Sequence, residues 1–286
     1  MVAAISERLV SRIKRHHRIH RAARRMRFVV GQFMPPRRFS GIPGRIHFND
    51  FMFINTSPQE IASYSERARN VIALIDETLG AAGKTSDDID RWLDFGCGYG
   101  RVIRFLGERV PRERIFASDV VKEAVEFCQS EFGVQPIYST SELTTVKLGV
   151  FDFIYSISVI THLNERNSVA FLRLLGDSLN PGGIAMFTTH GQWAIENLEE
   201  YGVEYELRKT EISDAVRQRG FAYLPYPFAG EDYGMAWHSR GYIETQKADL
   251  HEGQLMPLLF KPRGLDGHQD VYAFQRGASS GASRTA

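Results

Sequence analysis

A short stretch around residues 92–101 has the composition of a ligand-binding turn. Apolar residues predict a strand over 92–95 with Asp94 as its one acid, and a glycine-rich loop follows directly. The glycines of this loop alternate with other residues: Gly96, Gly98 and Gly100. Glycines let the backbone turn tightly and approach a ligand, and the helical spacing of apolar residues over 102–106 predicts a helix whose first N–H groups are free. The stretch therefore predicts a nucleotide-type site.

A second acid supports the same interpretation. Residues 114–120 form a short apolar run that ends in Asp119, about 20 residues beyond the glycines. That spacing is typical of a β-α-β unit in which the acid binds the hydroxyls of a ribose. The alternative is that Asp119 only caps the helix predicted to begin near Val121. The loop and the acid together favour the cofactor interpretation.

The order of the glycines separates two cofactor classes. A dinucleotide fold carries Gly-x-Gly-x-x-Gly, whereas this loop reads Gly-x-Gly-x-Gly with Asp94 two residues before it. It resembles motif I of the class I S-adenosylmethionine (SAM)-dependent methyltransferases. The Phe-Asp-Phe-Ile-Tyr run at 151–155 and the Asn-Pro-Gly-Gly run at 180–183 also resemble that family, so the resemblance covers about residues 90–190.

The resemblance implies S-adenosyl-L-methionine as the cofactor. In that family the acid before the glycines lies near the ammonium of the cofactor, which would be the role of Asp94, and the segment at Glu142 falls where adenine is held. The resemblance, with the spacing above, gives these cofactor-binding residues: Asp94, Phe95, Gly96, Cys97, Gly98, Gly100, Arg101, Asp119, Val120, Glu142, Leu143, Ser156 and Ile157.

Three histidines are the candidate catalytic residues. His162 follows the fourth predicted strand, His190 follows the fifth, and His268 lies in the last turn, so the three imidazoles would surround one pocket. Methyl transfer to a hydroxyl group requires removal of its proton, and imidazole is suited to this at physiological pH. His162 is the first choice as general base, because the end of the fourth strand lies closest to the transferable methyl in the family. A structural histidine is an equally weighted alternative.

The sequence argues against a metal and favours a hydroxyl acceptor. Histidines with Asp266 or Asp270 match no compact ligand spacing, so no metal is predicted. Methyltransferases of exocyclic amino groups commonly carry Asn/Asp-Pro-Pro-Tyr/Phe after the fourth strand, where this chain has residues 156–158, Ser-Ile-Ser. The Gly-His-Gln-Asp run at 267–270 resembles a bacterial branch whose members often accompany sugar-transferring enzymes.

The resulting prediction is O-methylation of a hydroxyl on a sugar, glycan or glycolipid. Two alternatives stay open. The first is a methyltransferase of another small molecule or natural product. The second is a SAM-binding protein associated with nucleic acid, whose basic arm does the recognising.

Alternating strands and helices predict the fold class α/β: a Rossmann-like, seven-stranded, mostly parallel sheet with helices on both faces. The resemblance implies that its last strand is antiparallel. The predicted strands cover residues 92–95, 114–120, 136–139, 151–158, 184–189, 255–260 and 271–274. An N-terminal arm (1–38), a helical and aromatic appendage (39–89), the methyltransferase domain (90–276) and a disordered tail (277–286) are expected. Residues 191–232, the least regular part, are interpreted as a substrate cap.

The N-terminal arm carries most of the charge asymmetry. Residues 1–38 hold eleven Lys or Arg and one acid, Glu7, whereas the remainder holds 24 basic and 33 acidic residues. Ile5, Leu9 and Ile13 repeat every four residues, which indicates a basic amphipathic helix suited to an anionic membrane surface. Nucleic acid is the weaker candidate partner, and a solvated tail weighs as much as either. With two cysteines and no long apolar run, a cytoplasmic protein, peripheral on the inner face of the membrane, is expected.

Overall fold

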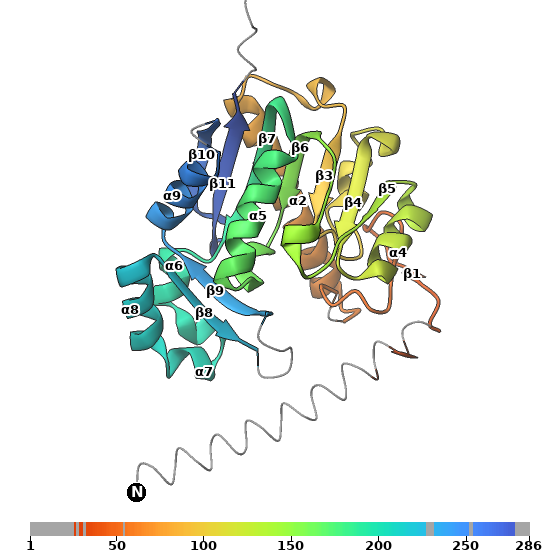
Figure 1. The fold of residues 1–286 in the computed structure, drawn as a ribbon. Helices are drawn as coiled ribbons and strands as arrows, with labels where there is room; N and C mark the ends of the chain where they lie inside the picture. Colours follow the sequence, from red (N-terminus) through yellow and green to blue (C-terminus); the bar gives the residue numbers. More distant parts are fainter. Residues whose placement is uncertain are drawn as a thin grey trace, which may run out of the picture.

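The computed structural model describes residues 33–53, 55–226, 232–251 and 254–277, together with Met26, Val29 and Val30. Its centre is a seven-stranded sheet with the strand order β10-β11-β7-β6-β3-β4-β5 (Figure 1). The parallel strands are β3 (Trp92–Phe95), β4 (Ile115–Asp119), β5 (Gln135–Tyr138), β6 (Phe151–Ser156) and β7 (Leu179–Thr189). β11 (Gln269–Arg276) runs antiparallel to both β7 and β10 (Leu255–Leu265). The predicted α/β, Rossmann-like fold with an antiparallel last strand is confirmed.

The strand order changes direction at β3. From β3 the chain moves outward through β4 to β5, and it then returns to place β6 on the other side of β3. In open α/β sheets the crevice outside the carboxyl ends of the strands at such a point is where ligands bind. The glycine loop after β3 and the residues after β6 therefore leave the sheet side by side at this edge.

Helices cover both faces of the sheet because successive strand residues point to opposite sides. Trp92 packs in one hydrophobic cluster with the helices α2 (Pro58–Ala81) and α4 (Lys122–Phe132). Leu93 packs in a second cluster with α5 (Glu165–Asp177) and α9 (Arg240–His251). These two apolar layers fix the sheet, and with it the edge that carries the glycine loop.

Helix α2 belongs to the core of the sheet domain. Ser57 is its N-cap and accepts a hydrogen bond from the Glu60 N–H at 3.2 Å, and Pro58 follows at the first helical position. The apolar face from Ala68 to Leu79 is buried in the same cluster as β3. The segment 39–89 thus docks on the sheet rather than standing apart from it.

Residues 191–232, expected to be the least regular part of the chain, contain three short helices and a strand. They form the helices α6 (Gln192–Glu196), α7 (Val203–Glu206) and α8 (Lys209–Arg219) and the strand β8 (Phe221–Pro225), which pairs with β9 (Gly234–His238). This unit, here called the cap, continues to His238 and has its own hydrophobic cluster. The hairpin of β8 and β9 was not recognisable from the sequence, because its pairing joins residues on either side of a loop.

Several element boundaries also differ from the prediction. β7 starts at Leu179 rather than Ile184, because Leu179 pairs with Phe151 across a bulge and draws the Asn-Pro-Gly-Gly run into the strand. β10 and β11 extend toward each other, so the last turn is only residues 266–268. The helix after the glycine loop, α3 (Ile103–Leu106), is a single turn.

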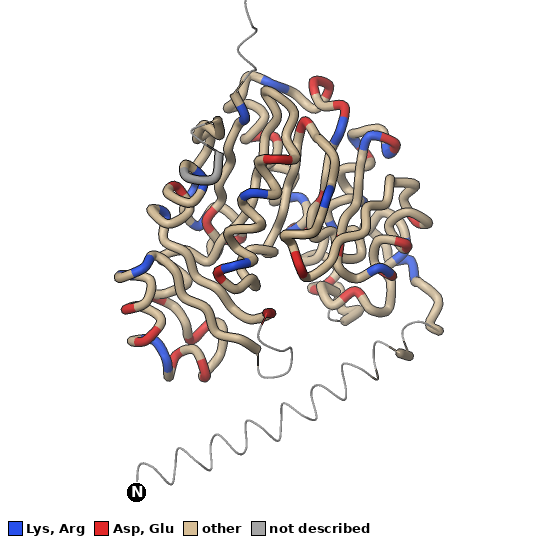
Figure 2. The backbone as a smooth tube through the Cα atoms, viewed as in Figure 1, with Lys and Arg blue, Asp and Glu red and all other residues tan. Residues whose placement is uncertain are grey.

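The predicted arm and tail lie almost wholly outside the described residues. The end of the arm forms β1 (Arg37–Arg38), which pairs with β2 (Arg45–Ile46). Figure 2 shows basic and acidic residues interspersed over the helices of the core and the cap. In the part of the chain that the structure describes, no helix is both long and apolar enough to cross a membrane.

Candidate active site

The glycine loop is held against the end of β4. The N–H groups of Gly96 and Cys97 both donate to the Ser118 carbonyl, at 2.8 and 3.0 Å, and the Gly100 N–H donates to the Cys97 carbonyl at 3.0 Å. All three glycines of the loop have positive φ angles, +90° at Gly96, +49° at Gly98 and +76° at Gly100. Side chains rarely adopt this backbone conformation, which explains the alternating glycines.

The glycines differ in what surrounds them. A Cβ atom at Gly96 would lie 2.2 Å from Cγ2 of Val159, and one at Gly100 would lie 2.6 Å from Cε2 of Phe132. At Gly98, no atom of the described residues beyond its chain neighbours lies within 4 Å of that position. Gly96 and Gly100 are therefore packing positions, whereas Gly98 leaves open space beside the backbone.

This difference predicts two outcomes for alanine substitution. Gly96→Ala should destabilise the fold by about 1–3 kcal/mol from overpacking against Val159 in addition to about 1–2 kcal/mol from its φ angle. Gly98→Ala should carry only the second cost. Thermal melting of both variants measures the difference, and equal melting temperatures would show that Val159 yields to the added methyl.

Asp119 joins the end of β4 to the glycine loop. One carboxylate oxygen accepts from the Gly98 N–H at 2.9 Å, and the other accepts from the Val121 N–H at 2.8 Å. Burial raises the pKa of Asp119, and these backbone hydrogen bonds act against that rise. The carboxylate thus reaches the loop and also fixes the backbone just before α4. Asp119 does not cap α4, because the N-cap of that helix is Val121 and no side chain caps it there.

Asp94 is a buried carboxyl group in the middle of the sheet. Its residue pairs in register with Tyr155 of β6 and Ala117 of β4, and its side chain is 3% exposed. Burial raises the pKa of Asp94 to about 8; the Tyr155 hydroxyl and Arg101 oppose the rise, and the Asp119 carboxylate adds to it. Carboxyl groups with strongly shifted pKa values cluster at functional sites.

Arg104 of α3 holds the glycine loop through its carbonyl groups, and no sequence pattern predicted this role. The buried guanidinium donates to the carbonyls of Gly100 and Tyr99 at 3.2 and 3.1 Å, and to those of Pro43 and Arg45 at 2.8 and 3.1 Å. One side chain therefore ties the glycine loop to the N-terminal segment. An arginine in a short amphipathic pattern reads as a surface residue, so only the fold shows this role.

The residues after β6 link the central strands at the same edge. The Ser156 hydroxyl donates to the Phe95 carbonyl at 2.7 Å. Ser158 has a φ of +59°, its N–H donates to the Thr188 hydroxyl at 2.9 Å, and its own hydroxyl donates to Oε1 of Gln269 at 3.1 Å. Ile157 lies between them, packed against the core. Strained backbone at this edge is a feature of functional sites.

The remaining candidate cofactor residues follow the strands β3, β4 and β5. Val120 is exposed directly after Asp119. Farther along the chain, Leu143 is buried in the second core cluster, and Glu142 pairs with Arg166 at 2.9 Å. Cys97 and Cys128 are both buried free thiols that donate weakly to the Gly98 carbonyl, at 3.3 and 3.5 Å.

His162 lies just beyond β6 and is oriented by the cap hairpin. Its Nδ1 lies 2.9 Å from the Gly234 carbonyl oxygen and 3.0 Å from the Tyr226 hydroxyl, and its ring centroid is 5.2 Å from that of Tyr233. A carbonyl oxygen only accepts, so the neutral ring carries its proton on Nδ1 and its lone pair on Nε2. Burial lowers the pKa of His162 from the usual 6.5, and the hydrogen bond to Gly234 opposes this.

The other two histidines lie nearby in different environments. His190 is buried, its Nδ1 lies 3.2 Å from the Ala236 carbonyl, and its ring meets that of Tyr201 at 4.9 Å. Burial, with smaller contributions from the nearby His162 and His268, lowers the pKa of His190 to about 3, and the hydrogen bond to Ala236 opposes this; the three rings therefore lie near one another. His268 is exposed, and its ring lies tilted beside that of Trp193, with the ring centroids 4.8 Å apart.

Tyr226 and Gly234 are the functional positions that sequence reasoning missed. Tyr226 lies in the expected substrate cap with no spacing that marks it, and Gly234 lies two residues beyond the expected end of the cap. The hairpin pairing brings Gly234 opposite Pro225, next to Tyr226, and a bridge between Leu163 and Tyr233 holds this end against His162. Among the described residues, no three His, Cys, Asp or Glu side chains are grouped closely enough to hold a metal ion.

Comparisons with known proteins agree with this geometry. A model of the methyltransferase domain family matches residues 64–226, which is more than half of the chain. The rRNA N(6)-adenosine-methyltransferase metl-5 of Caenorhabditis elegans is 25% identical over 146 residues, 46% of this chain and 63% of that protein. The chain thus spans less than two thirds of the length of this curated relative.

Solved structures with similar folds are distant in sequence. The magnesium protoporphyrin IX methyltransferase (ChlM) of Synechocystis, solved with bound SAH, is 13% identical, with 78% of this chain and 89% of that one covered at a TM-score of 0.48. An O-methyltransferase family protein of Burkholderia thailandensis is 13% identical, with 78% and 61% covered at a TM-score of 0.49. The family match over residues 64–226 is the finding that decides: the chain belongs to the methyltransferase domain family and is a class I methyltransferase with S-adenosylmethionine as its cofactor.

Proposed function

We propose that this enzyme transfers a methyl group to a hydroxyl of a sugar, glycan or glycolipid, with His162 as the general base. The observation that carries the proposal is the pair of contacts at Nδ1 of His162, which leaves the lone pair on Nε2. SAM supplies an electrophilic methyl group bound to a sulfonium. The chain must then orient the acceptor oxygen and take up its proton.

The residues around the glycine loop fit the cofactor. The open space beside Gly98 admits a ligand close to the backbone, and Asp119 at the end of β4 has lone pairs left for ribose hydroxyls. Asp94 and Arg101 suit the ammonium and carboxylate of the methionine part. We assign the following residues to the cofactor: Asp94, Phe95, Gly96, Cys97, Gly98, Gly100, Arg101, Asp119, Val120, Glu142, Leu143, Ser156 and Ile157.

Of the three histidines, His162 has the best chemistry for a base. Its lowered pKa keeps the ring neutral at physiological pH, and its Nδ1–H donates to Gly234, which supports the positive charge that develops when Nε2 takes a proton. The pKa of His190, about 3, makes that ring a weak proton acceptor. His268, exposed on the last turn, is better placed to contact the acceptor than to abstract its proton.

Tyr226 tunes this base and gives a testable pH effect. Its oxygen shares the Nδ1–H of His162, which stabilises the imidazolium more than the neutral ring. Tyr226→Phe should therefore lower the pKa of His162 by up to about one unit, since a hydrogen bond contributes about 0.5–1.5 kcal/mol. The acid limb of kcat/KM should lie below pH 6.5 in the wild type and move lower still in the variant.

NMR titration of the His162 ring checks the same shift without substrate. A pKa that does not move in Tyr226→Phe would mean that the phenol only packs beside the ring. An acid limb above the usual histidine value would contradict the lowered pKa. SAM affinity, measured by calorimetry, should be the same in both proteins.

Asp94 should release a proton when the cofactor binds. With a pKa of about 8, its carboxyl group is mostly protonated at pH 7 in the free protein, and a cationic ligand beside it favours the ionised form. Calorimetric binding enthalpies in buffers of different ionisation enthalpy should therefore reveal release of up to about one proton at pH 7. Asp94→Asn should bind more weakly and without this buffer dependence. Buffer-independent enthalpies for the wild type would show that Asp94 is already ionised.

The acceptor class is tested by transfer from labelled SAM. Neutral sugars, glycolipids and oligosaccharides should gain the mass of one methylene group, and the product should resist demethylation by mild acid as an ether does. RNA is the contrasting acceptor, because a relative acts on rRNA adenosine. The chain has Ser156-Ile157-Ser158 where amino-group methyltransferases commonly carry Asn/Asp-Pro-Pro-Tyr/Phe, which supports the hydroxyl. If the methyl group is transferred to RNA and to none of the hydroxylated acceptors, the proposed acceptor class is wrong.

The basic N-terminal arm suits a membrane partner. Its charge of +10 over residues 1–38 and its four-residue apolar repeat support an anionic lipid surface over nucleic acid, since the repeat is spaced for insertion. A glycolipid acceptor would be presented at such a surface. Acceptors that are soluble small molecules would not need the arm.

A further inference from the structure

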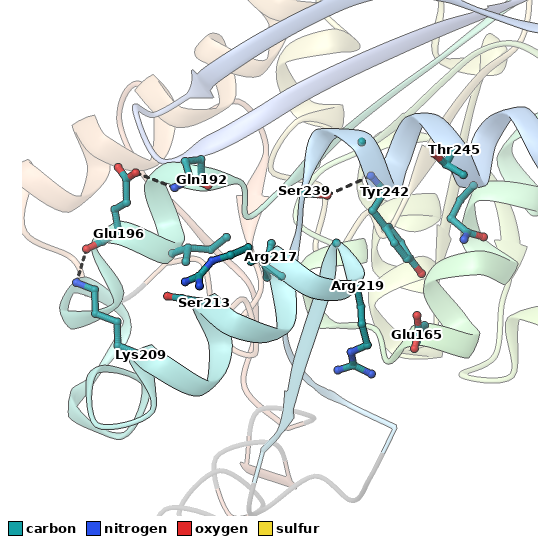
Figure 3. Close-up of a pocket in the computed structure, with 15 residues that line it drawn as sticks. Glu165, Gln192, Glu196, Lys209, Ser213, Arg217, Arg219, Ser239, Tyr242 and Thr245 are labelled. Carbon is teal, nitrogen blue, oxygen red and sulfur yellow. Dashed lines mark hydrogen bonds between the residues drawn. The ribbon is translucent and has the colours of Figure 1, made fainter.

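A cavity of about 930 Å³ lies where the cap meets the core, apart from the glycine loop (Figure 3). Its walls come from α6 and α8 of the cap, from the first residue of α5 and from the first two turns of α9. We call it the cap groove. Glu165 of the groove follows His162 by three residues, and Gln192 follows His190 by two. The groove therefore adjoins the chain segments that leave both β6 and β7.

The lining combines an apolar floor with hydroxyl and amide walls. Ile195 and Val216 line the groove from the hydrophobic cluster of the cap. The polar uncharged residues that surround them are Ser213, Ser239, Thr245, Gln192 and Gln246. Such a surface offers hydrogen-bond donors and acceptors in alternation beside a strip that can contact C–H groups.

The charges of the groove are mixed. Glu196 accepts from Gln192 at 2.7 Å, Lys209 donates to the Glu196 carbonyl at 2.6 Å, and Arg217 pairs with Asp214 at 3.1 Å. Arg219 forms no ion pair with a carboxylate within the described ranges, and it lies at the same end of the groove as Glu165 (Figure 3). The two glutamates, Glu165 and Glu196, would repel an anionic ligand, and the three cationic side chains would repel an amine. A hydroxyl can accept from Arg219 and donate to Glu165, so a neutral polyol suits both.

The distance from His162 limits the size of that ligand. β9 begins at Gly234, whose carbonyl contacts His162, and ends at His238, next to Ser239 of the groove. Four residue steps of a strand span about 13 Å. A single sugar ring cannot occupy both places, whereas a chain of sugars can.

We propose that the cap groove binds the distal sugars of a neutral oligosaccharide whose terminal hydroxyl is the methyl acceptor. This inference rests on the proposed O-methyltransferase function and specifies its substrate class. Hydroxyl groups of the oligosaccharide bind Arg219, Glu165 and the side-chain amides, and the C–H faces of its rings lie on Ile195 and Val216. The groove contributes affinity and selectivity, and the proton is taken at His162.

Gly241 offers a substitution that fills the groove without disturbing the fold. It lies in the first turn of α9 and lines the groove, and no described atom beyond its own helix turn and neighbours lies within 4 Å of the position where its Cβ would be. Leucine at this position is a better helix former than glycine. The matched control is Gly80→Leu, because Gly80 is also exposed and helical with the same open space, but lies at the end of α2.

The test measures binding of the full-length protein, without SAM, to an array of monosaccharides and of neutral, sulfated and amino-sugar oligosaccharides. Neutral oligosaccharides should bind, Gly241→Leu should reduce that binding by about tenfold or more, and Gly80→Leu should leave it unchanged. Arg219→Gln should reduce it as well. Binding confined to sulfated or amino sugars, binding unaffected by Gly241→Leu, or no binding at all would overturn the groove assignment.

The same variants separate this inference from the proposed function. For an oligosaccharide that accepts the methyl group, Gly241→Leu should raise KM and leave kcat unchanged. Methyl transfer to a monosaccharide should not change. If methyl transfer to hydroxyl groups is unaffected by Gly241→Leu for every acceptor, the groove assignment is wrong and the proposed function stands. If oligosaccharides bind in the groove but no hydroxyl group is methylated, the proposed function is wrong and the groove remains a sugar-binding site.

Discussion

His162→Ala should lower kcat by about 10²- to 10⁴-fold while SAM affinity stays at the wild-type value. A sugar hydroxyl is a poor nucleophile at neutral pH, so its proton must leave as the new oxygen–carbon bond forms. The neutral imidazole, with its proton fixed on Nδ1 by Gly234, presents the lone pair of Nε2 for that proton. The cofactor is assigned to a different set of residues around Gly98 and Asp119. Steady-state kinetics and calorimetry on the same preparations measure both quantities.

His268→Ala is the matched control for this substitution. His268 belongs to the same group of imidazoles, but it is exposed and its ring lies tilted beside that of Trp193. Its loss should change kcat far less than the loss of His162. The acid limb of the pH profile should disappear only in His162→Ala, and added imidazole should restore part of its rate. Normal turnover with an intact acid limb would make His162 a structural residue and leave proton removal to another group.

The glycine loop and its two acids were predictable because their constraints are local. Positive φ angles require glycine at Gly96, Gly98 and Gly100 whatever the rest of the chain does. Asp119 ends a strand, and a strand, a helix and a second strand set its spacing from the loop. The parallel direction of these strands follows from the alternation of strands and helices along the chain. The glycine loop, its two acids and the parallel sheet thus depend on residues that are close together in the sequence.

The environment of His162 was not predictable in the same way. Its partners Tyr226 and Gly234 follow it by 64 and 72 residues, and the β8–β9 pairing brings them together. Aromatic residues near prolines gave no period from which to read that hairpin. The early start of β7 has the same cause, because pairing of Leu179 with Phe151 overrides the turn preference of Asn-Pro-Gly-Gly. Contacts between distant residues decide both cases.

Asp119→Ala should weaken SAM binding by about 10²- to 10⁴-fold if both ribose hydroxyls bind its carboxylate. A hydrogen bond to a charged group contributes about 1.5–3 kcal/mol, and the substitution removes two. A carboxylate has about four lone-pair sites. The N–H groups of Gly98 and Val121 use two of them, so two remain for the ligand. Calorimetric titration with SAM, and with NAD in parallel, measures the effect and the cofactor preference together.

Asp119→Ala also removes the hydrogen bonds from the Gly98 and Val121 N–H groups, which lowers the stability of the fold. The control substitution must therefore lower stability in a similar way. Asp152 provides it, because its carboxylate accepts from the N–H groups of Asp90 and Arg91 at 3.2 and 3.0 Å and from Asn180 at 2.7 Å, at the opposite edge of the sheet. Asp152→Ala should lower the melting temperature and leave SAM affinity unchanged. Asp119→Asn keeps one acceptor oxygen and should bind with intermediate affinity. If Asp119→Ala binds SAM as the wild type does, Asp119 serves only to join the glycine loop to the start of α4, and the ribose is held elsewhere.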